Sequence, residues 1–583
     1  MHSSIRNLLL AGYVLVSTPV VFASDSLQSS SRCRCIRGDK CWPDQKQWSR
    51  LNSTVNGRLI SAAPLGLLCH EPNYDEASCA ILKENWALPQ THYPNPVEIM
   101  DPLAQNRSCD PFTPSSATCS LGNYVDYTIN VSSAADIAAG LEFAQKNNIR
   151  LVIKNTGHDY LAKSTGKSAL GIWTHNLKSF SVVNYTSPGY TGQAVKFGAG
   201  IQAFEIYAAA AAEGLRVVGG ECSTVGLAGG FLQGGGHSAL SSTYGMGSDQ
   251  VLEWEVVTAD GRHLVASPTK NQDLYWALSG GGGGTYAVVV TVIVKAFKDG
   301  IVGGAYLEFN KTGTSDEAFW KAVEEFHAAL PSIVDSGATA LYSLENDSFI
   351  VNAMTSPGST AEQMTALLQP FKAKMEALQV PHSMAVTSFS NYYQHFDHYL
   401  GPLPYGSPFI NIIDVSIAGR IIPRKVVQNE TSNTALIEAL KRGVYPGGGF
   451  AFGGVALNAP HSVAKNTPSS NAVLPAWRDA ILTVLAFAPW DYESTVMTNV
   501  NAEDYLIDVT VPALKALAPE GGAYLNEANR RQTDWKQSFY GVNYEKLRLI
   551  KKIYDPNDLF YGETAVGSDA WTPDSDGRLC RAH

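Results

Sequence analysis

The chain has 583 residues, of which 45% are hydrophobic and only 16% are charged. A chain of this length buries at least two hydrophobic cores, and its composition excludes wholesale disorder. The 43 Lys and Arg against 53 Asp and Glu give a net charge of −10, and no long basic run is present. A nucleic-acid-binding protein is therefore excluded, because phosphate contacts need clustered Lys and Arg.

The N-terminus indicates the compartment. His2 and Arg6 precede an apolar run from Leu8 to Phe22, and Val21-Phe22-Ala23 provides the small residues that a signal-peptidase cleavage site needs. This pattern predicts a secretory signal peptide at residues 1–23. A membrane anchor is the alternative, but the run is shorter than the ~20 apolar residues of a membrane span. We expect a secreted protein without membrane attachment.

Glycosylation sequons agree with export. Seven Asn-x-Ser/Thr sequences occur along the chain, so N-linked glycans are expected. They are centred on Asn52, Asn106, Asn130, Asn184, Asn310, Asn346 and Asn429.

Export also decides how the nine cysteines are interpreted. In an oxidising compartment thiols pair, and eight of the cysteines could form four disulfides: Cys33, Cys35, Cys41, Cys69, Cys79, Cys109, Cys119 and Cys580. The ninth, Cys222, stands apart in a glycine-rich apolar stretch. A buried inert thiol is one explanation, and a chemical role is the other.

The pattern of apolar residues predicts an alternation of strands and helices from about residue 120 onward. Strands are expected at Tyr124–Val131, Arg150–Lys154, Ala169–Thr174, Ala194–Phe197, Val251–Thr258 and Ala287–Val294, and helices at Ala134–Lys146 and Ala203–Glu213. In a second region we expect helices at Glu317–Leu330 and Ala361–Leu378, and strands at Phe349–Met354 and Ile410–Ile417.

Three short motifs could indicate a nucleotide-binding or a metal-binding site. The triplet Gly166-Lys167-Ser168 lacks the glycine of a P-loop, since Leu161 stands at that position. The stretch Gly198–Ala203 fits a G-x-G-x-x-A dinucleotide fingerprint and keeps an NAD-dependent enzyme as an alternative. His395–His398 offers too few ligands, so no metal site is expected.

Two glycine clusters carry the strongest chemical signal. Lys154–Tyr160 directly follows a predicted strand, and its glycine and small polar residues can turn backbone N–H groups toward an anionic pyrophosphate. Gly219–Gly230 continues to His237 and contains apolar residues that a solvated linker would not have. Such glycine density indicates backbone that lies close against a ligand.

Further motifs follow these clusters in a fixed order. They are Asp273–Ser279, Gly280–Gly284, Thr285–Val289, Phe539–Tyr544, Leu547, Lys551 and Tyr554-Asp555-Pro556. With the two clusters, this series resembles secreted fungal FAD-linked oxidoreductases of the vanillyl-alcohol oxidase/PCMH superfamily, in the berberine bridge enzyme-like branch.

This resemblance implies an α+β fold. It consists of a two-subdomain PCMH-type FAD-binding domain plus an α/β substrate-binding domain, an antiparallel sheet with covering helices. The expected order is signal peptide (1–23), cysteine-rich segment (24–120), FAD-binding domain (121–300), substrate-binding domain (301–530) and a C-terminal segment (531–575) that returns to the FAD-binding domain.

The resemblance also implies the cofactor. Members of this family often attach FAD twice, through a histidine and a cysteine, and the matching residues are His158 and Cys222. Eight paired cysteines and one on the flavin would then account for all nine, with a structural histidine and a buried thiol as the alternatives. The other residues expected to bind FAD are Asn155, Thr156, Gly157, Asp159, Gly220, Val225, Gly226, Gly229, Gly230, Gly235, Val288 and Asn543. Ala287 departs from the glycine that many members have at this position, and the local backbone contact to the cofactor is expected from Val288.

The implied reaction is oxidation of a C–H beside an O–H or N–H. The donor would be an alcohol, carbohydrate or secondary metabolite, with hydride transfer to flavin N5 and O2 reduced to H2O2. Val225 matches a position where valine accompanies the use of O2 in related enzymes. A side chain must take the acidic proton, and we rank Tyr524 first, then His237 and Asp414, although each could instead only pack or hydrogen-bond.

Other functions remain as alternatives. An oxidative cyclase or a dehydrogenase in secondary metabolism would use an acceptor other than O2. A non-catalytic secreted glycoprotein is a third class, against which the intact His158 and Cys222 speak.

Overall fold

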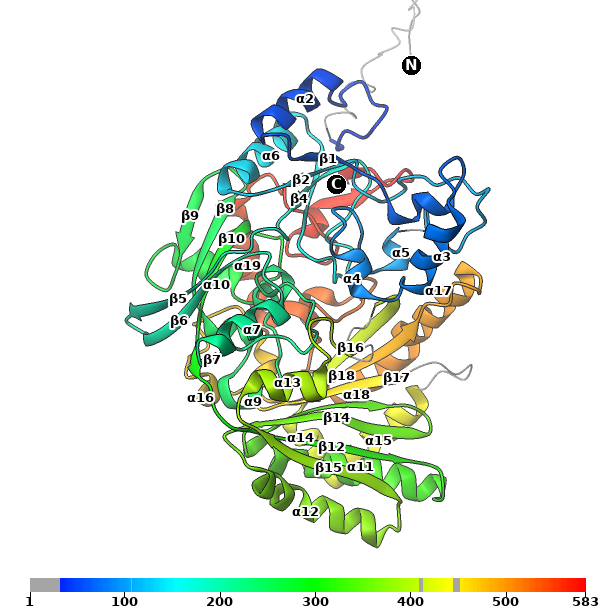
Figure 1. Ribbon diagram of the computed structural model, residues 1–583, viewed down its shortest axis with the longest axis vertical. Helices are drawn as coiled ribbons and strands as arrows, with labels where there is room; N and C mark the ends of the chain where they lie inside the picture. The colour runs from blue at the N-terminus through cyan, green and yellow to red at the C-terminus, as the bar shows by residue number, and fades with distance from the viewer. Residues whose placement is uncertain (1–31, 106, 408–412, 444–450, 583) are drawn as a thin grey trace, which may run out of the picture.

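The structure is a computed structural model that describes residues 32–105, 107–407, 413–443 and 451–582. The predicted signal peptide lies outside the described residues. The chain forms two lobes (Figure 1). The first lobe combines the N-terminal half with the C-terminal segment, and the second is formed by the middle of the chain.

A four-stranded sheet forms the part of the first lobe nearest to the chain ends. In spatial order its strands are β1 (Leu59–Ser61), β2 (Tyr127–Asn130), β4 (Ala169–Trp173) and β3 (Arg150–Lys154), of which β2, β4 and β3 are parallel. Helix α6 (Ala134–Lys146) joins β2 to β3 with the predicted bounds. It starts where the Ser133 side chain accepts a hydrogen bond from Asp136 N, and it buries Ile137 and Leu141 against the sheet.

A five-stranded antiparallel sheet forms the rest of the first lobe. Its order is β5 (Phe180–Ser187), β6 (Tyr190–Gly198), β10 (Ala287–Lys295), β8 (Val251–Thr258) and β9 (His263–Ala266). Helices α7 (Ala203–Ala212) and α10 (Gln272–Leu278) pack beside it.

This antiparallel pairing shows that the NAD alternative is wrong. The fingerprint at Gly198–Ala203 would need parallel βαβ strands, whereas β6 pairs antiparallel with both β5 and β10. The two glycines have a packing reason instead. A Cβ at Gly198 or Gly200 would collide with the backbone oxygen of Leu177 or His175.

The second lobe is built on a seven-stranded sheet whose neighbouring strands are all antiparallel. Its order is β15 (His382–Phe389), β12 (Val302–Asn310), β14 (Ser348–Pro357), β13 (Thr339–Leu344), β17 (Ala451–Ala456), β18 (Ala480–Pro489) and β16 (Val415–Pro423). The predicted helices of this region are confirmed, but the strand expected at Ile410–Ile417 begins only at Val415, and residues 410–412 lie outside the described part.

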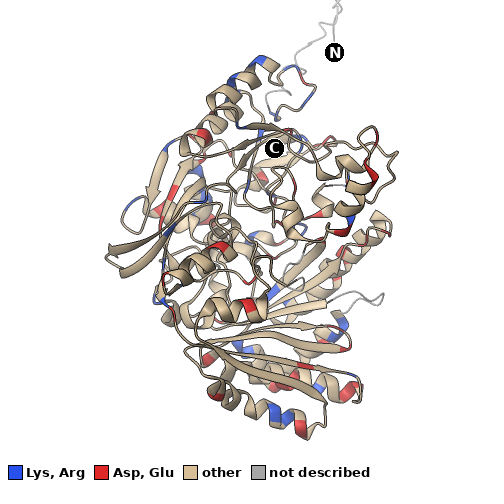
Figure 2. Ribbon diagram, in the orientation of Figure 1, with Lys and Arg blue, Asp and Glu red and all other residues tan. Residues whose placement is uncertain are grey.

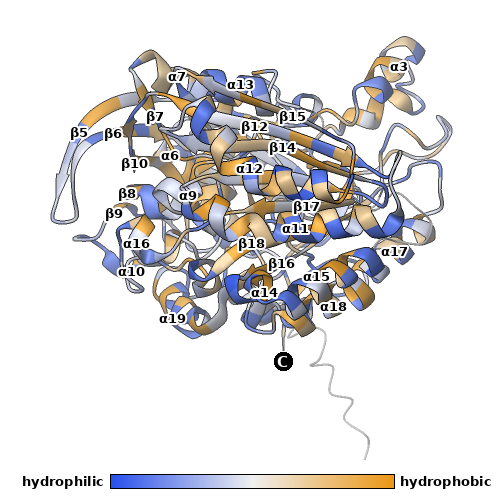
Figure 3. Cartoon of the chain, turned by 90° about the horizontal axis from the view of Figure 1, so that it is seen from below, coloured by the Kyte–Doolittle hydropathy of each residue, from blue (hydrophilic) through white to orange (hydrophobic). Residues whose placement is uncertain are grey.

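Helices cover one face of this sheet and bury a core that includes Phe326, Leu368 and Leu440 (Figure 1). They are α11 (Asp316–Asp335), α12 (Ala361–Ala377), α14 (Arg424–Gln428), α15 (Glu430–Gly443) and α18 (Val511–Leu517). Hydrophobic residues recur along strands such as β14 and β18 (Figure 3). On the other face, α13 (Tyr392–Leu400) packs against α7, with Phe396 4.8 Å from Tyr207 between ring centroids.

The C-terminal helix α19 (Tyr544–Tyr554) lies in the first lobe beside α10. Lys551, fully buried on this helix, donates hydrogen bonds to Thr285 O, Phe560 O and Asp555 Oδ2 at 2.8–2.9 Å. One ammonium group therefore joins α19 to the two loops that contain Thr285 and Phe560.

Four disulfides confirm that eight cysteines pair, and they settle the pairing that the sequence left open. They are Cys33–Cys580, Cys35–Cys41, Cys69–Cys79 and Cys109–Cys119. The cysteine-rich segment contains α2 (Gln45–Thr54), α3 (Glu76–Glu84), α4 (Pro89–His92) and α5 (Pro102–Gln105). Cys222 belongs to none of the four. Among the described helices, none is long and apolar enough to cross a lipid bilayer.

Candidate active site

A large cavity lies where the two sheets of the first lobe meet the sheet of the second. It encloses about 1950 Å³ of space between its lining atoms, with its open mouth included. Residues of both lobes line this space.

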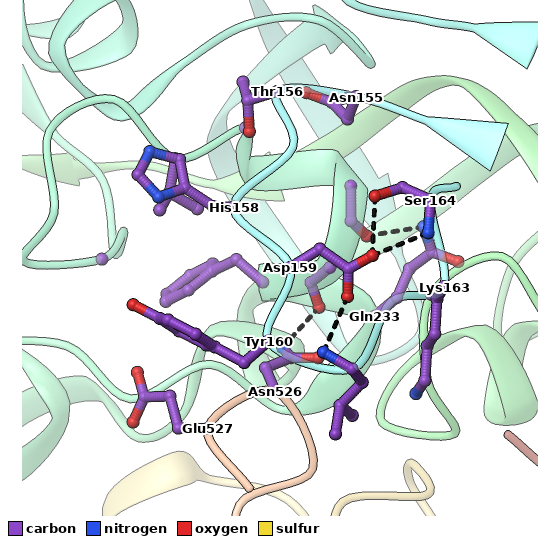
Figure 4. A pocket seen from close by; sticks show the side chains of 18 of the residues that line it. Asn155, Thr156, His158, Asp159, Tyr160, Lys163, Ser164, Gln233, Asn526 and Glu527 are labelled. Atoms are coloured by element: carbon purple, nitrogen blue, oxygen red, sulfur yellow. Dashed lines mark hydrogen bonds between the residues drawn. The ribbon is translucent and has the colours of Figure 1, made fainter. Parts of the chain in front are cut away.

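The loop after β3 forms one wall of the cavity (Figure 4). Gly157 has φ +91°, a conformation that other residues rarely adopt, and a Cβ there would lie 2.9 Å from Glu98 O. The Asp159 carboxylate accepts hydrogen bonds from Leu161 N (3.1 Å) and from the backbone and hydroxyl of Ser164 (2.6 Å each). These bonds hold the loop in a tight turn.

The second glycine cluster packs directly against this loop. A Cβ at Gly226 would collide with Asn155 Oδ1, and one at Gly229 would lie 3.0 Å from Asn155 Cβ. The Asn155 amide donates to Thr174 Oγ1 (3.1 Å) and Ala199 O (2.7 Å), but its buried Oδ1 has no protein partner. Buried polar atoms are nearly always hydrogen-bonded, so an unpartnered oxygen in a cavity wall indicates a ligand that donates to it.

His158 and Cys222 face the same part of the cavity from different loops. The Thr224 hydroxyl lies between them, 2.8 Å from His158 Nε2 and 3.7 Å from Cys222 Sγ. Burial lowers the pKa of His158 to about 3, so its imidazole is neutral. Burial raises the pKa of the Cys222 thiol to about 11. Both side chains thus present an uncharged nucleophilic atom to one site.

A charged cluster also lines this cavity. His237 Nδ1 is 3.2 Å from Glu221 Oε2, and His237 Nε2 is 2.8 Å from Glu527 Oε2. Burial alone would lower the pKa of His237, but the two carboxylates, Glu527 and Glu221, raise it well above its usual value. His237 is therefore an imidazolium held between two carboxylates.

Tyr524 and Asn526 border this cluster. Asn526 Nδ2 donates hydrogen bonds to Tyr524 Oη and to Gly230 O, each at 2.8 Å. The Tyr524 ring packs edge-on against His237 at 5.2 Å. Burial raises the pKa of Tyr524 far above its usual value, so the phenol keeps its proton at neutral pH.

Most of the residues that the sequence predicts for the site line the cavity. They are Asn155, Thr156, Gly157, His158, Asp159, Gly220, Cys222, Val225, Gly226, Gly229, Gly230, His237 and Tyr524.

Three predicted cofactor contacts lie outside the lining. Val288 is fully buried in β10, and its neighbours Ala287 and Val289 line the cavity instead, because successive side chains of a strand alternate between faces. Asn543 donates to Ala472 O and Val473 O, at 3.2 and 3.3 Å. Gly235 has φ +117° and serves the turn after the glycine cluster.

Asp414 also lies away from the cavity lining. It precedes β16, and burial raises the pKa of its carboxyl to about 6, against the opposing effects of His92 and of a hydrogen bond with Tyr492. We therefore do not retain Asp414 as a candidate base.

Several polar lining residues were not predicted from the sequence, among them Glu221, Glu527 and Tyr160. Glu221 sits inside the second glycine cluster, and Glu527 directly follows Tyr524-Leu525-Asn526. Tyr160 lies near Glu527 (Figure 4), and its pKa is raised by burial, by Cys222 and by Glu527. The signal was present: a charged residue within an apolar glycine-rich stretch needs a partner.

The residues present fit an FAD. Glycines let two loops approach each other, Asn155 Oδ1 and Gln233 Oε1 are buried acceptors without protein partners, and His158 and Cys222 share one site. Such turns of small residues are suited to a pyrophosphate. The fold and the cavity together define the class of protein, an FAD-binding oxidoreductase.

Comparisons with known proteins agree. Residues 125–267 match the FAD binding domain family, and residues 523–567 match the berberine and berberine-like family. The chain is 45% identical to the VAO-type flavoprotein oxidase VAO615 of Thermothelomyces thermophilus, over 98% of this chain and 99% of that protein. It is 46% identical to the FAD-linked oxidoreductase patO of Aspergillus clavatus, over 95% of each.

Solved structures give the same result. The crystal structure of the VAO-type flavoprotein MtVAO615 from Myceliophthora thermophila C1 matches with a TM-score of 0.90 and 44% identity, over 94% of this chain and all of that one. The glucooligosaccharide oxidase of Acremonium strictum, described with a 6-S-cysteinyl, 8α-N1-histidyl FAD, shares the fold at a TM-score of 0.63 and 20% identity, over 76% of this chain and 92% of that one. The chain therefore belongs to the VAO/PCMH family of fungal FAD-linked oxidoreductases, in its berberine bridge enzyme-like branch.

Proposed function

We propose that this oxidoreductase is a secreted oxidase with FAD attached through both His158 and Cys222. It would oxidise a C–H beside an O–H or N–H of a small molecule and use O2 as the acceptor. The observation that carries the proposal is the convergence of the two side chains on one hydroxyl, Thr224 Oγ1, in one cavity. No other described cysteine is available for this role, since the rest are in disulfides.

Two further observations support parts of the proposal. A doubly attached FAD is described for the glucooligosaccharide oxidase that shares this fold. The four disulfides favour an oxidising compartment, as secretion requires, and N-linked glycans at the sequons would follow from it.

The FAD, when bound, supplies a two-electron acceptor that takes a hydride from the substrate carbon, and O2 receives the two electrons and two protons as H2O2. The unpartnered oxygens of Asn155 and Gln233 would accept hydrogen bonds from the cofactor. Attachment through His158 and Cys222 would prevent its loss.

Proton transfer falls to Glu527. His237 already holds a proton between two carboxylates, and Tyr524 keeps its own. The Glu527 side chain is 23% exposed, against 8% for Glu221 and 7% for His237, so it is the carboxylate that a substrate hydroxyl reaches. Glu527 Oε2 would take the proton while His237, 2.8 Å away, fixes its position. This assignment replaces Tyr524 as the first-ranked base.

Tyr524 has a different task in this scheme. Its hydroxyl is held by Asn526 at 2.8 Å and borders the same polar cluster. It would donate a hydrogen bond to the substrate oxygen and so orient it.

An oxygen-uptake screen tests the proposal. The purified protein is supplied with benzyl alcohol, cinnamyl alcohol, 2-naphthylmethanol, xylitol and cellobiose, and H2O2 is measured beside O2 consumption. We expect at least one donor to give one H2O2 per O2 consumed. Flavin reduction by a donor without O2 uptake would instead identify a dehydrogenase or cyclase.

A further inference from the structure

The second lobe contributes an apolar wall to the cavity. Its side chains are Leu341 on β13, Ile417 on β16, Val455 on β17, and Leu485 and Phe487 on β18. Leu341 pairs with Val455, and Ile417 pairs with Phe487, so these side chains lie on one face of the sheet. We call these five residues the apolar wall.

Charge is confined to the opposite side of the cavity. The charged side chains in its lining come from loops of the first lobe and from the loop after Tyr524: Asp159, Lys163, Glu221, His237 and Glu527. The strands of the second lobe contribute none to the lining. Figure 2 shows these strands largely without charge, while Lys, Arg, Asp and Glu gather on the outer helices.

These strands bring one polar side chain to the lining, and its hydroxyl is hydrogen-bonded on the other face of the sheet. Tyr342 Oη is 2.8 Å from His327 Nε2, on the helix α11 that covers the other face of the sheet. Gly454, which pairs with Tyr342 on the neighbouring strand, has no side chain and so brings no hydrogen-bonding group. The apolar wall therefore offers a ligand no hydrogen-bonding side chain.

The wall is also shaped for a ring. A Cβ at Gly453 would lie 3.0 Å from the Phe487 ring, so glycine lets that ring pack onto the backbone of β17. With Leu485 and Ile417 beside it, the ring forms a broad apolar surface. Aromatic ligands gain from such contacts through apolar burial and ring stacking.

From this arrangement we propose that the substrate is an uncharged, ring-bearing apolar molecule with one hydroxyl, bound with the hydroxyl at Glu527 and the ring system on the apolar wall. This inference rests on the proposed function and names its substrate class. A sugar fits poorly, because its remaining hydroxyls would be buried without partners. An anion fits poorly at the polar end, because Glu221 and Glu527 outnumber the one imidazolium.

Isothermal titration of the flavin-loaded protein tests the inference without turnover. The probes are 2-naphthol, a ring alcohol without a carbinol C–H, and cellobiose. We expect the Kd of 2-naphthol to be at least about 100-fold lower than that of cellobiose, because several sugar hydroxyls would lose their partners. Tighter or equal binding of cellobiose would overturn the inference.

Variants of one wall residue separate polarity from folding. Leu485→Asn should weaken 2-naphthol binding about tenfold, whereas Leu485→Met should leave it unchanged. Val542→Asn, at a side chain that is 83% exposed and outside the cavity, is the matched surface control. Retained yellow colour and an unchanged melting temperature establish that each variant is folded. Equal 2-naphthol affinity in Leu485→Asn and wild type would contradict a role of the wall.

The outcome is distinguishable from that of the oxidase proposal. If 2-naphthol binds as expected but no donor yields H2O2, the oxidase proposal fails and the substrate class stands. If cellobiose yields H2O2 and 2-naphthol does not inhibit it, the oxidase proposal stands and the substrate class fails.

Discussion

At the scale of single residues, the chemistry depends on which group of the polar cluster can still accept a proton. His237 and Tyr524 are both protonated at neutral pH. Two carboxylates raise the pKa of His237, and burial raises the pKa of Tyr524. Glu527→Gln should therefore slow flavin reduction by the donor alcohol about 10²–10⁴-fold, the usual contribution of a general base. Anaerobic stopped-flow absorbance measures this rate.

Two controls accompany this prediction. Glu527→Asp should recover part of the rate, and dithionite should reduce the flavin of Glu527→Gln as in the wild type. The role of Glu527 would be refuted by a wild-type rate in Glu527→Gln together with a lost rate in Tyr524→Phe.

Val225 gives a second prediction at this scale. It lines the cavity three residues after Cys222, where it would sit at the edge of the flavin. Val225→Leu should slow reoxidation by O2 about tenfold or more, since one added methylene in a tight pocket is worth ~1–3 kcal/mol. Reduction by the donor should not change. Stopped-flow mixing of the reduced protein with O2 measures this rate, and equal reoxidation rates in the variant and the wild type would contradict a role of Val225 in the use of O2.

At the scale of elements, α19 holds two loops of the cavity through Lys551. Lys551→Met would leave Asp555, which is 1% exposed, as a buried carboxylate without its cation. We expect a loss of about 3–5 kcal/mol in the free energy of unfolding and a lower yield of attached flavin. Lys552→Met is the matched control, because Lys552 lies on the exposed side of the same helix. Similar melting temperatures for the two variants would count against this role of α19.

The elements also show how much of the fold could be predicted from the sequence. Helix α6 and strands β3 and β8 match their predicted bounds, because their apolar periodicity is strong and local. Most strands of the seven-stranded sheet were not predicted, since strand pairing over long sequence separations leaves little local signal.

The same difference between local motifs and long-range pairing applies to the site. The positions of His158 and Cys222 follow from short glycine-rich motifs, whereas the apolar wall is assembled from four strands far apart in the chain. Asp414 illustrates the same point: its partners His92 and Tyr492 come from other segments, so its position away from the cavity lining leaves no local signal.

At the scale of the whole molecule, the Cys33–Cys580 disulfide joins segments 547 residues apart. Replacing both cysteines by serine should cost about 2–5 kcal/mol, because cross-linking a long loop restricts the unfolded chain most. The Cys69–Cys79 pair, with a separation of 10 residues, is the control and should cost less. Thermal unfolding of the two double variants makes the comparison, and a larger loss for Cys69/Cys79 would contradict it.

The attachment of FAD to both His158 and Cys222 is the central claim, and one measurement tests it most directly. The protein is precipitated with acid, digested, and its yellow peptides are analysed by mass spectrometry. The account predicts colour in the precipitate and one species in which the peptides of His158 and Cys222 are joined through a single flavin. Colour released into the supernatant, or a flavin on only one of the two peptides, would contradict it.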